Sequence, residues 1–198
     1  MIHEGHVSPI ERFREAIERA KQAEPEYPDA AVLATVDATG RPSARVVLVR
    51  GYDERGFTFY TNHRSRKGQE LDGQKVAALC IHWKTLREQI RIEGSVARVS
   101  EAESDAYFAG RPRESQLGAH ASLQSELLSG REELERRLEQ ARADFDGAPV
   151  PRPTHWGGYR LTPDRVEFWN EGAFRLHDRS RYELQPESGT WLEQRLFP

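Results

Sequence analysis

The chain has 198 residues, of which 37% are hydrophobic and 31% charged, and it carries a net charge of −3. This composition is too apolar for a disordered chain, too polar for a membrane protein, and provides no global basic field for nucleic acid. The single cysteine, Cys80, excludes an intrachain disulfide, and its apolar surroundings predict a buried strand thiol. Because neither a leader-like start nor a membrane-length apolar stretch occurs, we expect a cytoplasmic protein.

The first predicted element is a helix that begins near residue 9. Ser8 and Pro9 are followed by apolar residues at helical spacing, and Glu11 stands three residues after Ser8. Ser8 is therefore the expected N-cap, with Glu11 completing a capping box. The proline-containing segment 24–29 ends this helix.

Strand patterns separated by turn residues dominate the rest of the chain. We expect strands over 31–36, 43–50, 57–61, 75–83, 88–99, 156–161, 165–169, 181–185 and 191–196. Helices are expected after Ser65, from Ser100 to about Ala109, over 115–122 and over 131–145. Because alternating βαβ units are absent, the pattern predicts a mainly β protein with peripheral helices (α+β), built on an antiparallel barrel.

The chain is expected to form one structural domain in three segments. Residues 1–29 form an N-terminal helix and linker, residues 30–146 the barrel core with its helices, and residues 147–198 a strand segment that completes the barrel. The histidines are scattered, so no metal site is expected, and neither a Gly-rich phosphate loop nor a Gly-x-Ser-x-Gly motif is present. If the protein is an enzyme, a cofactor therefore supplies the reactive group.

Two basic clusters suit phosphate groups. Residues 64–68 combine three cations with a hydroxyl at a predicted helix start, where the helix dipole favours anions. Alone, that cluster fits a solvated basic turn better. Tyr107 and Arg111 are four residues apart on a predicted helix and Ser115 follows, which makes a second phosphate cradle.

A third basic group lies near the C-terminus, at residues 175–179. In a strand, Arg175, His177 and Arg179 would point to one face. Three such side chains on one face are unfavourable without an anionic partner. The three clusters together suit a phosphorylated cofactor next to a phosphorylated substrate.

Several segments resemble the pyridoxamine/pyridoxine 5′-phosphate oxidase family, in the family's order and from about residue 30 to the end. They are RVVLVRG (45–51), FYTN (59–62), SRKG (65–68), QIRIEG (89–94), RPRESQLGA (111–119), QS (124–125), WGGY (156–159), VEFW (166–169), RLHDR (175–179) and RLFP (195–198). Ten short motifs in one order are far more specific than any of them alone.

The resemblance implies an FMN-binding split β-barrel that forms a homodimer, with FMN at the subunit interface. The positions that match flavin contacts are Arg45, Val46, Val47, Leu48, Val49, Arg50, Tyr60, Thr61, Arg66, Lys67, Gln89, Gln124, Ser125, Trp169 and Arg179. Those that match contacts to the substrate phosphate are Arg50, Tyr107, Arg111 and Ser115. Arg175 and His177 match catalytic residues placed against the substrate ring.

The implied reaction removes a hydride from C4′ of pyridoxamine or pyridoxine 5′-phosphate and delivers it to flavin N5. Reduced flavin then passes electrons to O2, which gives H2O2 and pyridoxal 5′-phosphate. The flavin carries the redox step, while the protein supplies orientation and electrostatics.

The sequence departs from the family pattern at two places. Position 50 is commonly lysine and here is Arg50, which keeps the charge but is bulkier and forked. Residues 1–7 are short for the upstream arm that closes over the substrate in family members. Two other functions stay open: a related flavin oxidase of phenazine-type pathways, and a flavin- or pyridoxal-phosphate-binding protein with little turnover. Relatives of the phenazine type usually lose parts of segment 111–119, which is present here.

Overall fold

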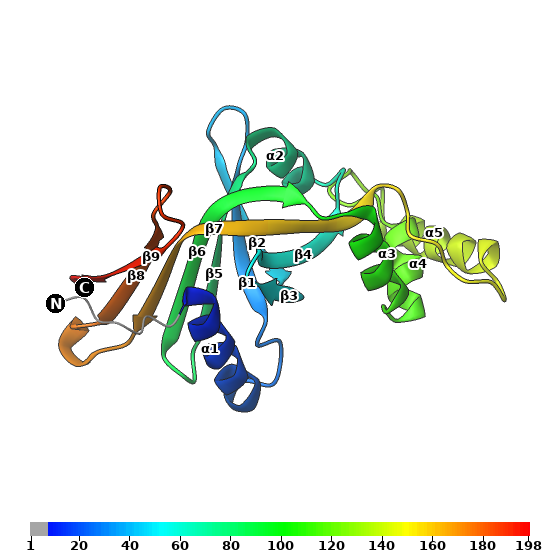
Figure 1. Cartoon of the computed structure of the whole chain (residues 1–198). Coiled ribbons are helices and arrows are strands. Elements are labelled where there is room, and N and C mark those ends of the chain that lie inside the picture. The colour runs from blue at the N-terminus through cyan, green and yellow to red at the C-terminus, as the bar shows by residue number, and fades with distance from the viewer. Residues whose placement is uncertain (1–7) are drawn as a thin grey trace.

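The computed structural model describes residues 8–198, which fold into one antiparallel sheet of nine strands with helices around it (Figure 1). The expectation for the arm at residues 1–7 lies outside the described residues. The strands are β1 Ala30–Val36, β2 Pro42–Leu48, β3 Gly51–Asp53, β4 Gly56–Asn62, β5 Val76–Trp83, β6 Glu88–Arg98, β7 Trp156–Asn170, β8 Asp178–Leu184 and β9 Trp191–Leu196. Their order is β2-β1-β5-β6-β7-β4-β3, with β8 paired to β7 and β9 to β8. The predicted fold class, mainly β with peripheral helices, is confirmed.

The helices are α1 Pro9–Ala23, α2 Arg66–Gln74, α3 Glu101–Ala109, α4 Arg113–Ala121 and α5 Arg131–Asp144, with a short 3₁₀ turn at Ala173–Arg175. The predicted caps are confirmed: the hydroxyls of Ser8, Ser65 and Ser100 each accept a hydrogen bond from the backbone N–H three residues later. Such caps satisfy N–H groups that have no partner inside the helix. The sequence therefore sets where three of the five α-helices in residues 8–198 begin.

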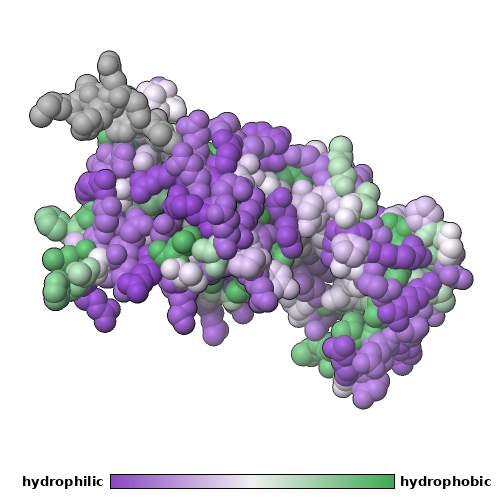
Figure 2. Space-filling model, turned by 90° about the horizontal axis from the view of Figure 1, so that it is seen from below, coloured by the Kyte–Doolittle hydropathy of each residue, from purple (hydrophilic) through white to green (hydrophobic). Residues whose placement is uncertain are grey.

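The main core lies between the sheet and α1. Phe13 of α1 packs edge-on against Phe57, at a ring-centroid distance of 4.8 Å, and against Tyr52 at 5.1 Å. A second, smaller core joins α3, α4 and α5 to the start of β7 through Phe108 and Trp156. Figure 1 shows α3–α5 at one end of the sheet and β8 and β9 at the other, and Figure 2 shows the α3–α5 end as a projecting lobe.

Strand β7 corrects one prediction. The strands expected at 156–161 and 165–169 form a single strand of 15 residues that pairs with β4 at its start, with β8 at its end and with β6 along its length. Pro163 does not end it, because β6 shifts register at Glu93/Gly94 directly opposite. A side chain at Gly94 would meet the backbone oxygen of Thr162 at 2.0 Å, so glycine permits this close approach.

The strand predicted through residues 175–179 is wrong in its first half. The backbone turns there, with φ of 57° at Phe174 and 67° at Arg175, and β8 begins only at Asp178. Arg175 and His177 therefore lie in a turn and not on the strand face that carries Arg179. Two smaller predictions also fail: β3 was missed, and Cys80 is only half-buried.

Candidate active site

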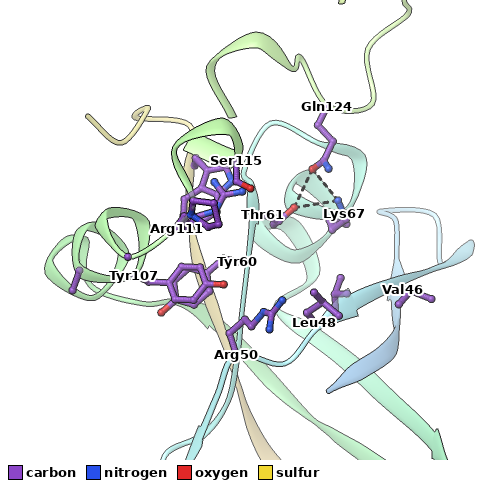
Figure 3. A pocket seen from close by; sticks show the side chains of 15 residues that line it. Val46, Leu48, Arg50, Tyr60, Thr61, Lys67, Tyr107, Arg111, Ser115 and Gln124 are labelled. Atoms are coloured by element: carbon purple, nitrogen blue, oxygen red, sulfur yellow. Dashed lines mark hydrogen bonds between the residues drawn. The ribbon is translucent and has the colours of Figure 1, made fainter. Parts of the chain in front are cut away.

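A cavity of about 780 Å³ lies between the β2 and β4 strands of the sheet and helices α3 and α4 (Figure 3). Eleven of the predicted site residues line it: Val46, Val47, Leu48, Arg50, Tyr60, Thr61, Lys67, Tyr107, Arg111, Ser115 and Gln124. We call this set the cavity half. It brings together members of the two predicted phosphate clusters, Lys67 from one and Tyr107, Arg111 and Ser115 from the other, although Lys67 and Tyr107 are about 40 residues apart in the sequence.

Lys67 forms one cationic end of the cavity. Its ammonium donates to Thr61 Oγ1 at 3.1 Å and to Gln124 Oε1 at 3.0 Å, and Thr61 donates to the same amide oxygen at 3.0 Å (Figure 3). Lys67 is only 9% exposed. Burial and, to a smaller extent, the charge of Arg45 lower the pKa of Lys67 to about 8, against the opposing effect of Glu70. A buried ammonium with only neutral hydrogen-bond partners is suited to an anionic ligand.

Arg111 forms the other cationic end, on a platform of stacked aromatic rings. Tyr60 and Tyr107 stack at 3.7 Å with an interplanar angle of 4°, and Trp156 continues the stack. The Arg111 guanidinium lies over Trp156, 4.5 Å from the ring centroid. Its Nη1 is buried and has no hydrogen-bond partner in the described chain. Burial lowers the pKa of Arg111, so a ligand anion here would relieve an unpaired charge.

Arg50 lies between the two ends, below them in Figure 3. Its Nη1 is 3.0 Å from Asp29 Oδ2, and its backbone N–H bonds to Thr58 O at 2.8 Å. The same side chain borders a second cavity of about 720 Å³, which Tyr27 and Tyr52 also line. The residue that replaces the family's lysine is therefore held by an acidic partner at the boundary of two cavities.

Four predicted cofactor residues from this part of the chain do not line the cavity: Arg45, Val49, Arg66 and Ser125. Val49 is 4% exposed and belongs to the main core. Ser125 follows Gln124 in a turn, with a left-handed φ of 76°. Arg45 and Arg66 both contact the buried carboxylate of Glu70.

The remaining five predicted residues, Gln89, Trp169, Arg175, His177 and Arg179, form a separate group that we call the C-terminal half. Gln89, Trp169 and Arg179 are directly opposite one another on β6, β7 and β8. Arg179 is fixed by Glu167, with Nε 2.8 Å from Oε1. None of the five lines the cavity, and the β8 end lies opposite α3 and α4 (Figure 1).

Within the C-terminal half, the His177 side chain has contacts in its own chain, whereas the Arg175 side chain is exposed. The backbone N–H of Gly172 donates to His177 Nδ1 at 3.2 Å, and the imidazole packs on Trp169 at 4.6 Å. The Arg175 side chain is exposed and has no hydrogen bond or ion pair within residues 8–198. Phe174 and Leu176 beside it are 93% and 70% exposed.

Two residues that the sequence patterns did not single out contribute to the geometry of the candidate site. Trp156 lines the cavity and supports Arg111, although its motif WGGY was recognised without a role for the indole. Glu70, on the helix expected after Ser65, was given no role. Its burial depends on Thr35 and Ser43, about 30 residues earlier, and no local pattern shows that contact.

Family models match nearly the whole chain. The model described as pyridoxamine 5′-phosphate oxidase matches residues 17–145, and the model of the pyridoxine 5′-phosphate oxidase C-terminal dimerisation region matches residues 156–198. The chain belongs to the pyridoxamine 5′-phosphate oxidase family. The family predicted from the short motifs is thus confirmed, and the chain carries the dimerisation region of this family.

Relatives in the pyridoxamine 5′-phosphate oxidase family extend over the full length. A pyridoxine/pyridoxamine 5′-phosphate oxidase of Myxococcus xanthus is 56% identical over 200 residues, which covers 100% of this chain and 96% of the relative. One of Agrobacterium fabrum is 47% identical and covers 96% of this chain and 92% of the relative. The crystal structure of PhzG from Burkholderia lata 383, in complex with tetrahydrophenazine-1-carboxylic acid, has a TM-score of 0.91 at 34% identity, covering 98% of this chain and 95% of that one.

A more distant neighbour supports the fold alone. A pyridoxamine 5′-phosphate oxidase-related, FMN-binding protein from Nostoc punctiforme has a TM-score of 0.76 at 21% identity, covering 97% of this chain and 98% of that one. The split-barrel architecture is therefore shared well beyond the close relatives. Among residues 8–198, no helix is both long and apolar enough to cross a membrane.

Proposed function

We propose that this protein is an FMN-dependent oxidase that converts pyridoxamine 5′-phosphate and pyridoxine 5′-phosphate to pyridoxal 5′-phosphate, with O2 as acceptor and H2O2 as product. One observation carries the proposal: a single cavity has cationic ends at Lys67 and Arg111, with Arg50 between them. Two phosphorylated molecules side by side suit this charge distribution. The enzyme class and the FMN cofactor are those of the family to which the chain belongs.

The residues at the Lys67 end fit an FMN phosphate. Lys67 is buried without an acidic hydrogen-bond partner, and it follows the Ser65-capped start of α2, where a helix favours anions. Val46, Val47 and Leu48 line the cavity beside it and offer apolar surface for a flavin ring. The cavity volume of about 780 Å³ is within the range of ligand sites in proteins.

The Arg111 end fits the phosphate of the substrate. Arg111 has an unpaired buried N–H, and the hydroxyls of Tyr107 and Ser115 lie beside it in the cavity wall. The stack of Tyr60, Tyr107 and Trp156 keeps the guanidinium in place before any ligand binds. Holding the phosphate positions the substrate ring for reaction, which is the main contribution that a protein makes beside a redox cofactor.

When bound, FMN supplies hydride acceptance from the substrate and electron transfer to O2. The protein residues orient the substrate for that step. His177 accepts a hydrogen bond at Nδ1 from Gly172, so the neutral ring carries its proton at Nε2. That N–H would donate to the ring hydroxyl of the substrate, and Arg175 would lie against the substrate ring.

We further propose that each active site uses the cavity half of one subunit and the C-terminal half of its partner, with FMN at the interface. The two halves lie apart in one chain, and the C-terminal half belongs to the matched dimerisation region. Phe174, Leu176 and Phe197 expose most of their apolar surface there, and Figure 2 shows hydrophobic side chains at this end. Such surface favours burial against a second copy.

The primary test is to add pyridoxamine 5′-phosphate to the purified, FMN-loaded protein and to measure H2O2 and pyridoxal 5′-phosphate. A yellow protein that forms both products supports the proposal. A yellow protein that is inactive on both B6 phosphates would point to the low-turnover binding function. Oxidation of a tetrahydrophenazine carboxylic acid in preference to them would favour the phenazine-type alternative, which the PhzG likeness at 34% identity keeps in view.

Sharing of the site between subunits can be tested by complementation. Lys67→Met weakens FMN binding in the cavity half and Arg175→Ala disables the C-terminal half, so at an FMN concentration near the wild-type Kd each homodimer should have little activity. In mixed dimers one of the two sites is intact, so random mixing should restore about a quarter of wild-type activity. If both halves came from the same subunit, the mixture would remain as inactive as its parents.

A further inference from the structure

A buried carboxylate lies behind the Lys67 end of the cavity. Glu70, on α2, is 7% exposed. Its Oε2 accepts hydrogen bonds from the hydroxyls of Thr35 at 2.5 Å and Ser43 at 2.7 Å, and lies 3.3 Å from Arg45 Nη2. Its Oε1 accepts from Arg66 Nε at 2.8 Å. One carboxylate thus ties together strands β1 and β2, helix α2 and two arginines.

The two hydroxyls also connect Glu70 to Arg45 indirectly. Arg45 Nη1 donates to Thr35 Oγ1 and Arg45 Nη2 donates to Ser43 Oγ, each at 2.5 Å. Each hydroxyl therefore accepts from the guanidinium and donates to the carboxylate, which uses both its functions. Since every member is bonded, the network fixes the guanidinium more firmly than a single ion pair would.

Arg66 is held differently and stays available to a ligand. Glu70 occupies only its Nε, four residues along the same helix. The terminal nitrogens of Arg66 have no hydrogen bond within the described chain, and the side chain is 56% exposed. A guanidinium fixed at Nε keeps four terminal N–H groups that can bind phosphate oxygens.

The charges of this cluster balance those of a phosphate. Arg45, Arg66 and Lys67 contribute three positive charges and Glu70 one negative charge, which leaves a surplus of two. A phosphate monoester carries a charge close to −2 at pH 7. Burial alone would raise the pKa of Glu70, but hydrogen bonds from Thr35, Ser43 and Arg66 outweigh it and bring the pKa to about 2. Glu70 is therefore ionised throughout the working range of pH.

We propose that Glu70 is a positioning residue for the cofactor phosphate, holding Arg45 and Arg66 beside Lys67 so that the three cations act on one anion. This inference rests on the proposed function, because it takes the Lys67 end as the FMN phosphate site. A carboxylate in a cationic anion site would by itself weaken binding by screening. The positioning effect of Glu70 therefore strengthens phosphate binding, whereas its negative charge weakens it. An experiment can separate the two effects.

The test compares FMN with riboflavin, which lacks the phosphate, by quenching of flavin fluorescence on the full-length apoprotein. In Glu70→Gln we expect FMN affinity to fall about tenfold, because Arg45 and Arg66 lose a charged hydrogen-bond partner. Riboflavin affinity should stay within about twofold of wild type. Asp72→Asn is the matched control, since Asp72 lies on the same helix and pairs with Arg98, away from the cavity. It should bind both flavins as the wild type does.

Ser43→Ala is a milder second variant that keeps Glu70 and removes one hydroxyl link, and about threefold weaker FMN binding is expected. Unchanged or tighter FMN binding in Glu70→Gln would overturn the inference, since screening alone predicts that result. Equal losses for FMN and riboflavin would also overturn it. If the wild-type protein itself fails to bind FMN, the proposed function fails, which is a different result from binding that is insensitive to Glu70.

Discussion

Lys67 and Arg175 belong to the two halves of the proposed site, and they differ in burial and in hydrogen bonding. Lys67 is buried and makes hydrogen bonds to Thr61 and Gln124 of its own chain. Arg175 is exposed, has a left-handed backbone, and finds no side-chain partner among residues 8–198. The cavity half is thus organised by one subunit alone, whereas the C-terminal half presents its key side chain outwards.

This difference indicates that the two halves have separate roles in the site. Beside each half a buried glutamate fixes an arginine: Glu70 holds Arg45, and Glu167 holds Arg179. In the cavity half, Lys67 has hydrogen-bond partners and Arg111 is packed over Trp156, whereas Arg175 is exposed and has no side-chain partner among residues 8–198. We infer that cofactor binding depends on the cavity half and that the chemical step depends on Arg175 reaching a substrate held by the partner subunit.

The largest effect is expected for Arg175→Ala. Turnover with pyridoxamine 5′-phosphate should fall at least about a hundredfold, because the proposed function places this charge against the reacting ring. FMN affinity should stay within about twofold of wild type. Steady-state kinetics measure turnover, and flavin titration measures FMN affinity. Arg165→Ala, which removes a surface arginine of β7, is the control. Unchanged turnover in Arg175→Ala would remove the functional distinction between the halves.

Lys67→Met should give the complementary result. FMN affinity at pH 7 is expected to fall about thirtyfold, because a charge-assisted contact to phosphate is lost. The pKa of Lys67 is about 8, so its charge is present below that pH and lost above it. Wild-type FMN affinity should therefore fall between pH 7 and pH 9, while Glu70 stays ionised. A titration with equal slopes for wild type and variant would contradict this role.

Trp156→Leu tests whether the aromatic platform holds Arg111. Loss of the ring beneath the guanidinium should raise KM for pyridoxamine 5′-phosphate about tenfold and change kcat little. Trp156→Phe keeps an aromatic face beneath the guanidinium and should raise this KM only about threefold. A fall in kcat at constant KM would instead assign Trp156 to the chemical step.

The smallest effect concerns the stability of the fold around His63. His63 is buried beside Tyr159, and neither ring nitrogen has a hydrogen-bond partner in the described structure. Burial lowers the pKa of His63, and Arg98 lowers it further. The unfolded chain therefore binds a proton more readily, so stability falls as pH drops below about 6.5. Tm should decrease by roughly 2–4 °C more in the wild type than in His63→Leu between pH 7 and pH 5.

Much of this architecture could be predicted from local patterns, because caps and strand alternation are local. Ser65 and Ser100 carry their signal within three residues of the helix start. Pro163 misled the strand prediction, since it sits where β6 shifts register and no ladder N–H is needed. The charged alternation at 175–179 imitated a strand, although Gly172 lets the chain double back close to Leu176.

The sequence motifs name candidate site residues but do not show how these residues are arranged in space. The family motifs include both Lys67 and Arg175. Nothing in the sequence shows that the fold places these two residues far apart within one subunit. Glu70 was missed for the same reason, because contacts with β1 and β2 give it a role that its helix does not reveal.

Strand β7 starts at Trp156 in the cavity wall and reaches Trp169 in the C-terminal half without interruption. At about 3.3 Å per residue these thirteen steps give a path of about 43 Å. In the proposed dimer, β7 is therefore a molecular ruler that sets the spacing between the two active sites. Deleting one residue from its middle would turn Trp169 to the opposite face and misalign both sites at once. The turn near Gly189 does not set this spacing, so insertion or deletion of a residue should be tolerated there.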